Sequence, residues 1–257
     1  MVISIWVENS GSHIERAGLM KRQVHLFLSS LTLAFSFAAH GQGTFQNLGF
    51  EAASLVPIPG DGFGRVQFDA AFPNWIGYVG GVQQGSALYN STFLDSAGIG
   101  IIDNNFPGTF NASAGVLAGS YSAILQAGVS LNNPSPTLVD TTLSQTSLVP
   151  VSANSLRFRV YYWPNPLLIF LGGQRLPLVE LQSAANYTLL GADVRAWQGQ
   201  VARLDFHLLH PLAFINNTIK LDAIQFSVQP IPEPATFGLI ALGAVALGGG
   251  MLRRNRT

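Results

Sequence analysis

Side chains that could do chemistry are sparse in this chain of 257 residues. It has 13 Asp and Glu, five His and no Cys, so thiol catalysis and disulfides are excluded. His207 and His210 have the spacing of metal ligands only in a helix, because residues three apart point to opposite faces of a strand. The sequence holds no Gly-x-Ser-x-Gly nucleophile motif and no phosphate-binding loop. This pattern predicts a protein that is not an enzyme.

Aromatic side chains are the better candidates for ligand binding. Tyr161 and Trp163 alternate with apolar residues and therefore belong to the polar face of their segment. The apolar face of a sugar ring stacks on such side chains, while neighbouring amides and hydroxyls bind its OH groups. We expect these two residues to contact any polysaccharide that the domain binds. The alternative is that they only cover a neighbouring strand.

The elements that must position these residues are strands. Short alternating apolar runs, separated by Gly, Pro, Asn and Ser, fill residues 43–228, which is typical of an all-β sandwich or barrel. In the clearest run, Leu156, Phe158 and Val160 face one way and Arg157 and Arg159 the other. We expect the first strand at 47–51 and further strands at 121–127, 143–149, 155–163, 167–171, 175–181, 201–209 and 218–228.

The last of these segments contains an irregularity. Ile219 and Leu221 stand at odd positions, whereas Ile224 and Phe226 stand at even ones. If one extra residue is inserted at this switch, the apolar side chains on both sides of it point to the core. We therefore expect a β-bulge here, which changes the direction of the Asp222 side chain.

Several short motifs resemble those of galactose-binding-like jelly rolls, the β-sandwiches typical of bacterial carbohydrate-binding modules. The motifs are Asn47 to Glu51, Pro73-Asn74-Trp75, Gly119 to Leu125, Ala192 to Gln200 and Leu221 to Phe226, in that order. The resemblance implies a jelly-roll β-sandwich. It also implies that Glu51 and Asp222 meet as ligands of a structural calcium ion, completed by main-chain carbonyls or waters. The alternative is that both carboxylates cap strand ends or face solvent.

The start of the chain carries an export signal. Lys21-Arg22 and the apolar residues 24–39 form the charged and hydrophobic regions of a signal peptide, expected as a helix over residues 20–41. Met20 is then the expected start, residues 1–19 a mis-assigned extension and Gln42 the first mature residue. We expect export by the Sec machinery.

The end of the chain carries a second signal. Pro232-Glu233-Pro234 precedes an uncharged stretch, 235–252, which as a helix is roughly 27 Å long and can span a bilayer. Arg253 and Arg254 follow it, as expected of a cytoplasmic end. This order resembles the PEP-CTERM sorting signal, which implies a Gram-negative host, a transient transmembrane helix in the inner membrane and processing by an exosortase. Residues 230–257 are assigned to this signal.

Between the two signals, residues 42–229 are expected to form one domain. The net charge is zero and only 10% of residues are charged, which excludes a nucleic-acid-binding surface. The sequence therefore predicts an exported, non-catalytic protein of the cell surface or extracellular matrix that binds polysaccharide. The alternatives are a self-associating structural surface protein and a glycan hydrolase.

Overall fold

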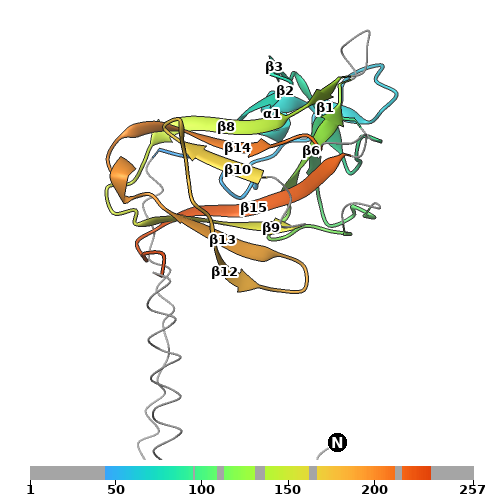
Figure 1. Ribbon diagram of the computed structural model, residues 1–257. Helices are drawn as coiled ribbons and strands as arrows, with labels where there is room; N and C mark the ends of the chain where they lie inside the picture. The colour runs from blue at the N-terminus through green and yellow to red at the C-terminus, as the bar shows by residue number, and fades with distance from the viewer. Residues whose placement is uncertain are drawn as a thin grey trace, which may run out of the picture. The chain divides into compact units, whose positions relative to one another are not determined.

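The computed structural model describes residues 44–94, 96–108, 113–130, 137–161, 167–211 and 216–232, all within one compact unit, Ala38–Thr257. These residues form a sandwich of two β-sheets (Figure 1), so the predicted all-β sandwich is confirmed. Within this described part, no helix has the length and apolar character needed to cross a membrane. The predicted signal helix and transmembrane helix lie outside the described residues.

In the described part of the chain, the larger sheet has nine strands. They are β1 (Arg65–Gln67), β4 (Ser86–Tyr89), β5 (Gly98–Ile102), β6 (Ser122–Val129), β7 (Leu138–Val139), β9 (Ser155–Tyr161), β12 (Val179–Ser183), β13 (Thr188–Asp193) and β15 (Asn217–Ser227). Their order is β1-β4-β5-β6-β15-β9-β13-β12, and β7 pairs with β6 beside this path. The pairing of β4 with β5 is parallel and the other pairings are antiparallel.

The smaller sheet has six strands among the residues that the structure describes. They are β2 (Ile76–Val79), β3 (Val82–Gln83), β8 (Thr141–Leu148), β10 (Leu167–Leu171), β11 (Gln174–Arg175) and β14 (Val201–Leu208), in the order β11-β10-β14-β8-β2-β3. From β6 onward the chain crosses repeatedly between the sheets, which is compatible with a jelly roll. The described helices are short, namely α1 (Phe68–Ala71) and a 3-10 turn at Arg195–Trp197.

The core lies between the two sheets and follows the alternation expected from the sequence. Leu156, Phe158 and Val160 of β9 are fully buried against Leu204 and Phe206 of β14 and their neighbours. The Phe158 and Phe206 rings meet edge to face at 5.2 Å between centroids. Burial of side chains of this size contributes about 1.5–3 kcal/mol each.

The predicted bulge in the last strand is confirmed. The pairing of β15 with β9 shifts register between Asp222 and Gln225, and Ala223 has a left-handed backbone with φ of 49°. As a result Leu221 and Ile224, although three positions apart, are both buried in the core.

Two expectations for the strands were wrong, and strand β5 was missed. Residues 47–51, expected to open the sheet, form consecutive turns in which Asn47 and Phe50 have φ of 51° and 61°. The segment 175–181 is divided between β11 and β12, since Pro177 between them lacks the N–H that a ladder needs. Strand β5 was missed because all five of its residues are buried, so its sequence shows no alternation.

The loop between β5 and β6, described at 103–108 and 113–121, covers the outer face of β6 and β15 and is called the covering loop. Ile102, Phe106 and Ile124, with Val116 packed against them, form a second apolar cluster separate from the main core. Residues 218–222 of β15 are consequently buried on both faces. This arrangement encloses two charged side chains of β15 that alternate with its core residues.

Candidate functional site

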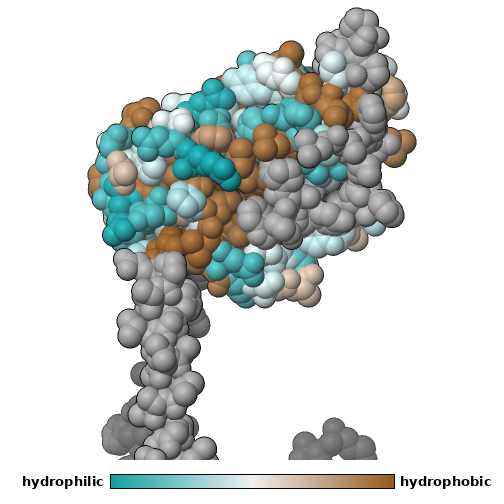
Figure 2. All heavy atoms as spheres, in the orientation of Figure 1, coloured by the Kyte–Doolittle hydropathy of each residue, from teal (hydrophilic) through white to brown (hydrophobic). Residues whose placement is uncertain are grey.

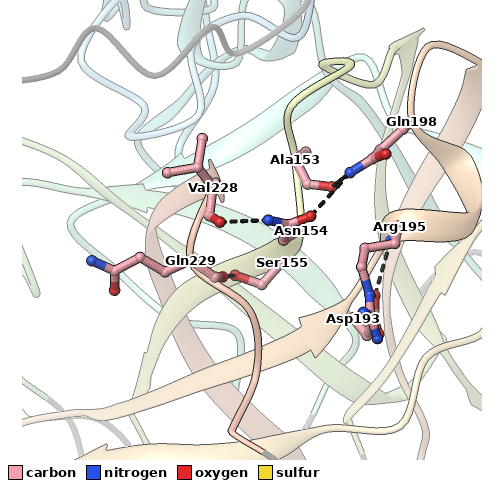
Figure 3. Close-up of polar contacts among 8 residues, drawn as sticks. All are labelled: Ala153, Asn154, Ser155, Asp193, Arg195, Gln198, Val228 and Gln229. Atoms are coloured by element: carbon pink, nitrogen blue, oxygen red, sulfur yellow. Dashed lines mark hydrogen bonds and ion pairs between the residues drawn. The ribbon is translucent and has the colours of Figure 1, made fainter.

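The described part of the predicted sorting signal is the short segment by which the chain leaves the sandwich. Asn154 Nδ2 donates to the carbonyl of Val228 at 2.6 Å, and Ser155 Oγ donates to the carbonyl of Gln229 at 2.7 Å (Figure 3). Gln198 Nε2 in turn donates to Asn154 Oδ1 at 3.1 Å. The start of β9 therefore fixes the chain directly after β15.

Arg157 extends this attachment by one residue. Its guanidinium donates to the carbonyls of Gln229 and Pro230, each at 3.3 Å, and to the side chain of Gln229 at 3.2 Å. Ile231 lies against Gly191 of β13, where a Cβ would come within 2.6 Å of the Ile231 Cδ1 atom. The first residues of the sorting signal, Pro230 and Ile231, therefore contact side chains and backbone of the sandwich. Of the predicted sorting residues, Pro232 is described, whereas Glu233, Pro234, Arg253 and Arg254 lie outside the described residues.

Glu51, one of the two predicted calcium ligands, binds the covering loop. Its carboxylate accepts the backbone N–H of Ser120 at 2.9 Å and 3.0 Å, and that of Tyr121 at 3.4 Å. Gly119 makes this approach possible, because a Cβ there would lie 2.0 Å from Glu51 Oε1. Gly119 also has a φ of 57°, which favours glycine.

Asp222, the other predicted ligand, lies in β15 and binds the same loop. Its Oδ2 atom accepts the N–H of Ala118 at 2.9 Å and the hydroxyl of Ser122 at 2.6 Å, and Oδ1 accepts the N–H of Ala223. Asp222 is 1% exposed, and burial raises the pKa of its carboxyl to about 6 against the lowering effect of these bonds. The structure therefore brings Glu51 and Asp222 to neighbouring residues of one loop.

Two cations hold the other half of this loop. Lys220 Nζ donates to the carbonyls of Ser113 and Gly115 at 3.2 Å and 3.0 Å, and to the Ser113 hydroxyl at 2.8 Å. Arg159 donates to the carbonyl of Leu117 at 3.0 Å. Lys220 is 1% exposed, and burial lowers the pKa of its ammonium to about 8. Carbonyl groups from 113 to 117 thus bind cations, and N–H groups from 118 to 121 bind carboxylates.

These contacts do not fit a calcium ion at Glu51 and Asp222. Calcium needs six to eight oxygens at about 2.3–2.6 Å, supplied here by the two carboxylates and nearby carbonyls. The carboxylates instead accept N–H groups, whose positive ends repel a cation, and the carbonyls bind Lys220 and Arg159. In the part of the chain that the structure covers, no group of three or more His, Asp or Glu side chains is arranged to hold a metal.

Of the two aromatic residues predicted to bind a ligand, Tyr161 is described and Trp163 is not. Tyr161 is partly buried on β9, directly opposite Lys220 in β15. The Lys220 ammonium lies 5.0 Å from the centre of its ring, a distance at which a cation is attracted to an aromatic face. One role of Tyr161 is therefore to pack against Lys220.

A cluster that sequence reasoning dismissed lies on the smaller sheet. His207 Nε2 and His210 Nδ1 both contact the Asp140 carboxylate, at 3.0 Å and 2.5 Å. The expectation that the two histidines point apart was wrong, because β14 ends at Leu208 and His210 is no longer bound by strand geometry. The sequence carried no signal for this cluster, because Asp140 meets the histidines only through the pairing of β8 with β14.

Comparison with known families identifies the end of the chain. Residues 230–256 match the PEP-CTERM protein-sorting motif. No curated protein and no solved structure shows significant similarity to this chain. The matched segment is a sorting signal read by exosortase, and the protein is accordingly an exported one that is processed at the membrane of a Gram-negative bacterium.

Proposed function

We propose that this is a non-catalytic protein of the cell surface or extracellular matrix that binds polysaccharide through its β-sandwich. The observation that carries the proposal is the position of the sorting signal. The signal starts at residue 230, three residues after β15 ends at Ser227, so the exported part of the chain is the sandwich. A single exported sandwich with a removable anchor suits a binding or structural role outside the cell.

The engagement of the acidic side chains supports a non-catalytic role. Glu51 and Asp222 bind backbone N–H groups of one loop, while Asp193 and Asp205 form ion pairs with Arg195 and Arg203. A glycosidase needs two carboxylates facing each other across a cleft at about 5–9.5 Å, one of them with a raised pKa. Asp222 has the raised pKa but is buried beneath the loop, away from any substrate.

Cosedimentation with polysaccharides tests the binding part of the proposal. The full chain, purified in detergent from a Gram-negative host, is incubated with insoluble cellulose, chitin and curdlan. It is also run through gels containing soluble xyloglucan, galactomannan, laminarin and alginate. We expect retention by at least one polymer. A protein that is retained by none of these seven polymers contradicts polysaccharide binding but leaves the export assignment intact.

Self-association is the second candidate, favoured by an exposed apolar patch. Phe63 and Leu94 are 75% and 91% exposed and border a hollow of about 360 Å³ that Leu88 and Phe93 also line. Figure 2 shows hydrophilic and hydrophobic residues interspersed on the visible face of the molecule. Light scattering across a hundredfold concentration range separates the candidates, since a self-associating protein gains mass with concentration and a strict monomer does not.

A further inference from the structure

A hollow of about 460 Å³ opens on the smaller sheet beside the Gly80-Gly81 turn. Strands β2, β8 and β14 each contribute one side chain to a row across it. Tyr78 stands directly opposite Thr142, and Thr142 directly opposite His207. Directly opposed residues of neighbouring strands point to the same face, so an aromatic ring, a hydroxyl and an imidazole lie side by side.

Asp140 fixes the histidines of this hollow in one arrangement. Its Oδ2 contacts His207 Nε2 at 3.0 Å, and its Oδ1 accepts the backbone N–H of His210 at 2.8 Å and contacts His210 Nδ1. A carboxylate can only accept, so both of these ring nitrogens carry the proton. His207 Nδ1, 2.9 Å from Thr142 Oγ1, then accepts the hydroxyl proton when the ring is neutral. His210 Nε2 remains as an acceptor for a ligand.

The Asp140 carboxylate stays ionised in this arrangement. Burial acts to raise its pKa, but the hydrogen bonds from His210 and His207 outweigh burial and hold the pKa below its ordinary value. The network is therefore complete at neutral pH and presents a preorganised surface.

Arg203 supplies donors on the other side of the hollow. Its Nε donates to Asp205 Oδ1 at 2.7 Å, and its guanidinium carbon lies 5.4 Å from the centre of the Tyr78 ring. The Arg203 side chain is about half exposed, and its terminal amino groups are available to a ligand. The hollow thus offers donors, acceptors and an aromatic ring within one small volume.

The charges decide the class of ligand. Arg203 is paired with the Asp205 carboxylate, and both histidines contact the Asp140 carboxylate. Among the described side chains of this hollow, no cation lacks a carboxylate partner, which disfavours a uronic-acid polymer. Hydroxyl groups, which both donate and accept, match the mixed donors and acceptors.

We propose that this hollow binds a neutral polysaccharide, with Tyr78 contacting a sugar ring and Arg203, His210 and Asp140 binding its hydroxyls. The proposal rests on the proposed polysaccharide-binding function and names the site and the ligand class. It places the ligand on the sheet opposite to the one that carries Tyr161.

Affinity gel electrophoresis of the full-length protein tests the site with xyloglucan, galactomannan and laminarin as neutral probes and alginate as the acidic probe. Arg203→Ala, Tyr78→Ala and His210→Gln are each expected to weaken binding of a retained neutral polymer at least tenfold. Arg195→Ala is the matched control for Arg203→Ala, because Arg195 also pairs with an aspartate two residues away on an exposed surface. Tyr187→Ala matches Tyr78→Ala, because Tyr187 also packs against an arginine. Both controls should bind as the unchanged protein does.

Thermal unfolding confirms that each variant is folded, and Arg203→Ala, at an exposed side chain, keeps the test decisive if Tyr78→Ala unfolds. Retention of the unchanged protein together with full binding by the hollow variants overturns this site while polysaccharide binding stands. Loss of binding in Tyr161→Ala alone moves the site to the larger sheet and also overturns it. Retention by alginate only contradicts the neutral class of ligand. Failure of the unchanged protein to bind any polymer overturns both proposals.

Discussion

Lys220 and Asp222 stand two residues apart on the outer face of β15 and bind opposite halves of one loop. Lys220 binds the carbonyl of Gly115 at 3.0 Å, and Asp222 binds the N–H of Ala118 at 2.9 Å. Both side chains are 1% exposed. Burial of an unpaired charge costs several kcal/mol. The polar groups of the loop therefore compensate the buried charges of Lys220 and Asp222, and the two side chains in turn hold the loop in place.

Replacement of Gly119 by Ala tests how closely the loop fits Glu51. The added Cβ would displace the Glu51 carboxylate, which then loses charge-assisted bonds worth about 1.5–3 kcal/mol. Gly115→Ala is the control, since Gly115 has a similar φ of 66° but no atom within 4 Å of the added Cβ. We expect Gly115→Ala to lower the free energy of unfolding by about 1 kcal/mol for the backbone conformation alone, and Gly119→Ala by about 2 kcal/mol more. Equal losses in urea titrations would contradict the close contact.

Chemical labelling tests the burial of Lys220. Apart from Lys21, Lys220 is the only lysine in the sequence, so an amine-reactive ester reads it directly. Because a reagent reaches Lys220 only when the loop opens, we expect labelling in the native protein to be about 100-fold slower than in denaturant. A peptide of residues 216–225 serves as the unprotected control. Native labelling at the rate of the peptide would show that the loop does not cover Lys220.

The calcium prediction has a direct test in thermal unfolding. An ion that binds only the folded state stabilises it by about 2.7 kcal/mol at a hundred times its dissociation constant. Since the carboxylates of Glu51 and Asp222 already accept N–H groups, we expect the same midpoint in 5 mM calcium and in EDTA. A midpoint several degrees higher in calcium, absent from Glu51→Gln, would restore the calcium site implied by the jelly-roll resemblance.

The free energy of unfolding should depend on pH because of the raised pKa of Asp222. Its folded-state pKa of about 6 lies above the unfolded value of 3.8, so its ionisation opposes folding. The stability present below pH 4 is lost as the pH rises through 6, by about 3 kcal/mol at 1.4 kcal/mol per pKa unit. Asp222→Asn should remove this slope between pH 4 and 6, whatever its effect on absolute stability. An unchanged difference between the two proteins across that range would contradict the raised pKa.

The sequence predicts those parts of the fold in which one strand face is buried and the other exposed. Segments 155–163 and 201–209 alternate, and their core residues could be read from that alternation. The bulge near Asp222 could be read from the switch of the apolar positions within 218–228. Strand β5 could not, because both of its faces are buried, with Gly98 against Phe93 and Gly100 against Leu88. Pairing between distant residues is likewise invisible in sequence, so Asp140 with His210 emerges only when β8 and β14 are neighbours.

The candidate site shows the same limit. The resemblance to jelly rolls implied a shared ion for Glu51 and Asp222, whereas in the structure both carboxylates accept N–H groups of one loop. The carbonyls of this loop accept hydrogen bonds from Lys220 and Arg159. Lys220 is only two residues from Asp222 and shares its face, yet nothing in its sequence context shows that a loop about 105 residues earlier will cover it. The loop conformation, with Gly115 and Gly119 at positive φ, is likewise not evident from the pattern of apolar residues.

Cleavage at the sorting signal should be visible at the C-terminus of the exported protein. The measurement is mass spectrometry of the C-terminal peptide, from protein recovered from a Gram-negative host with exosortase and from the same host without it. We expect a chain that ends at Glu233 or Pro234 in the first host and at Thr257 in the second. An intact C-terminus at Thr257 in both hosts would contradict it.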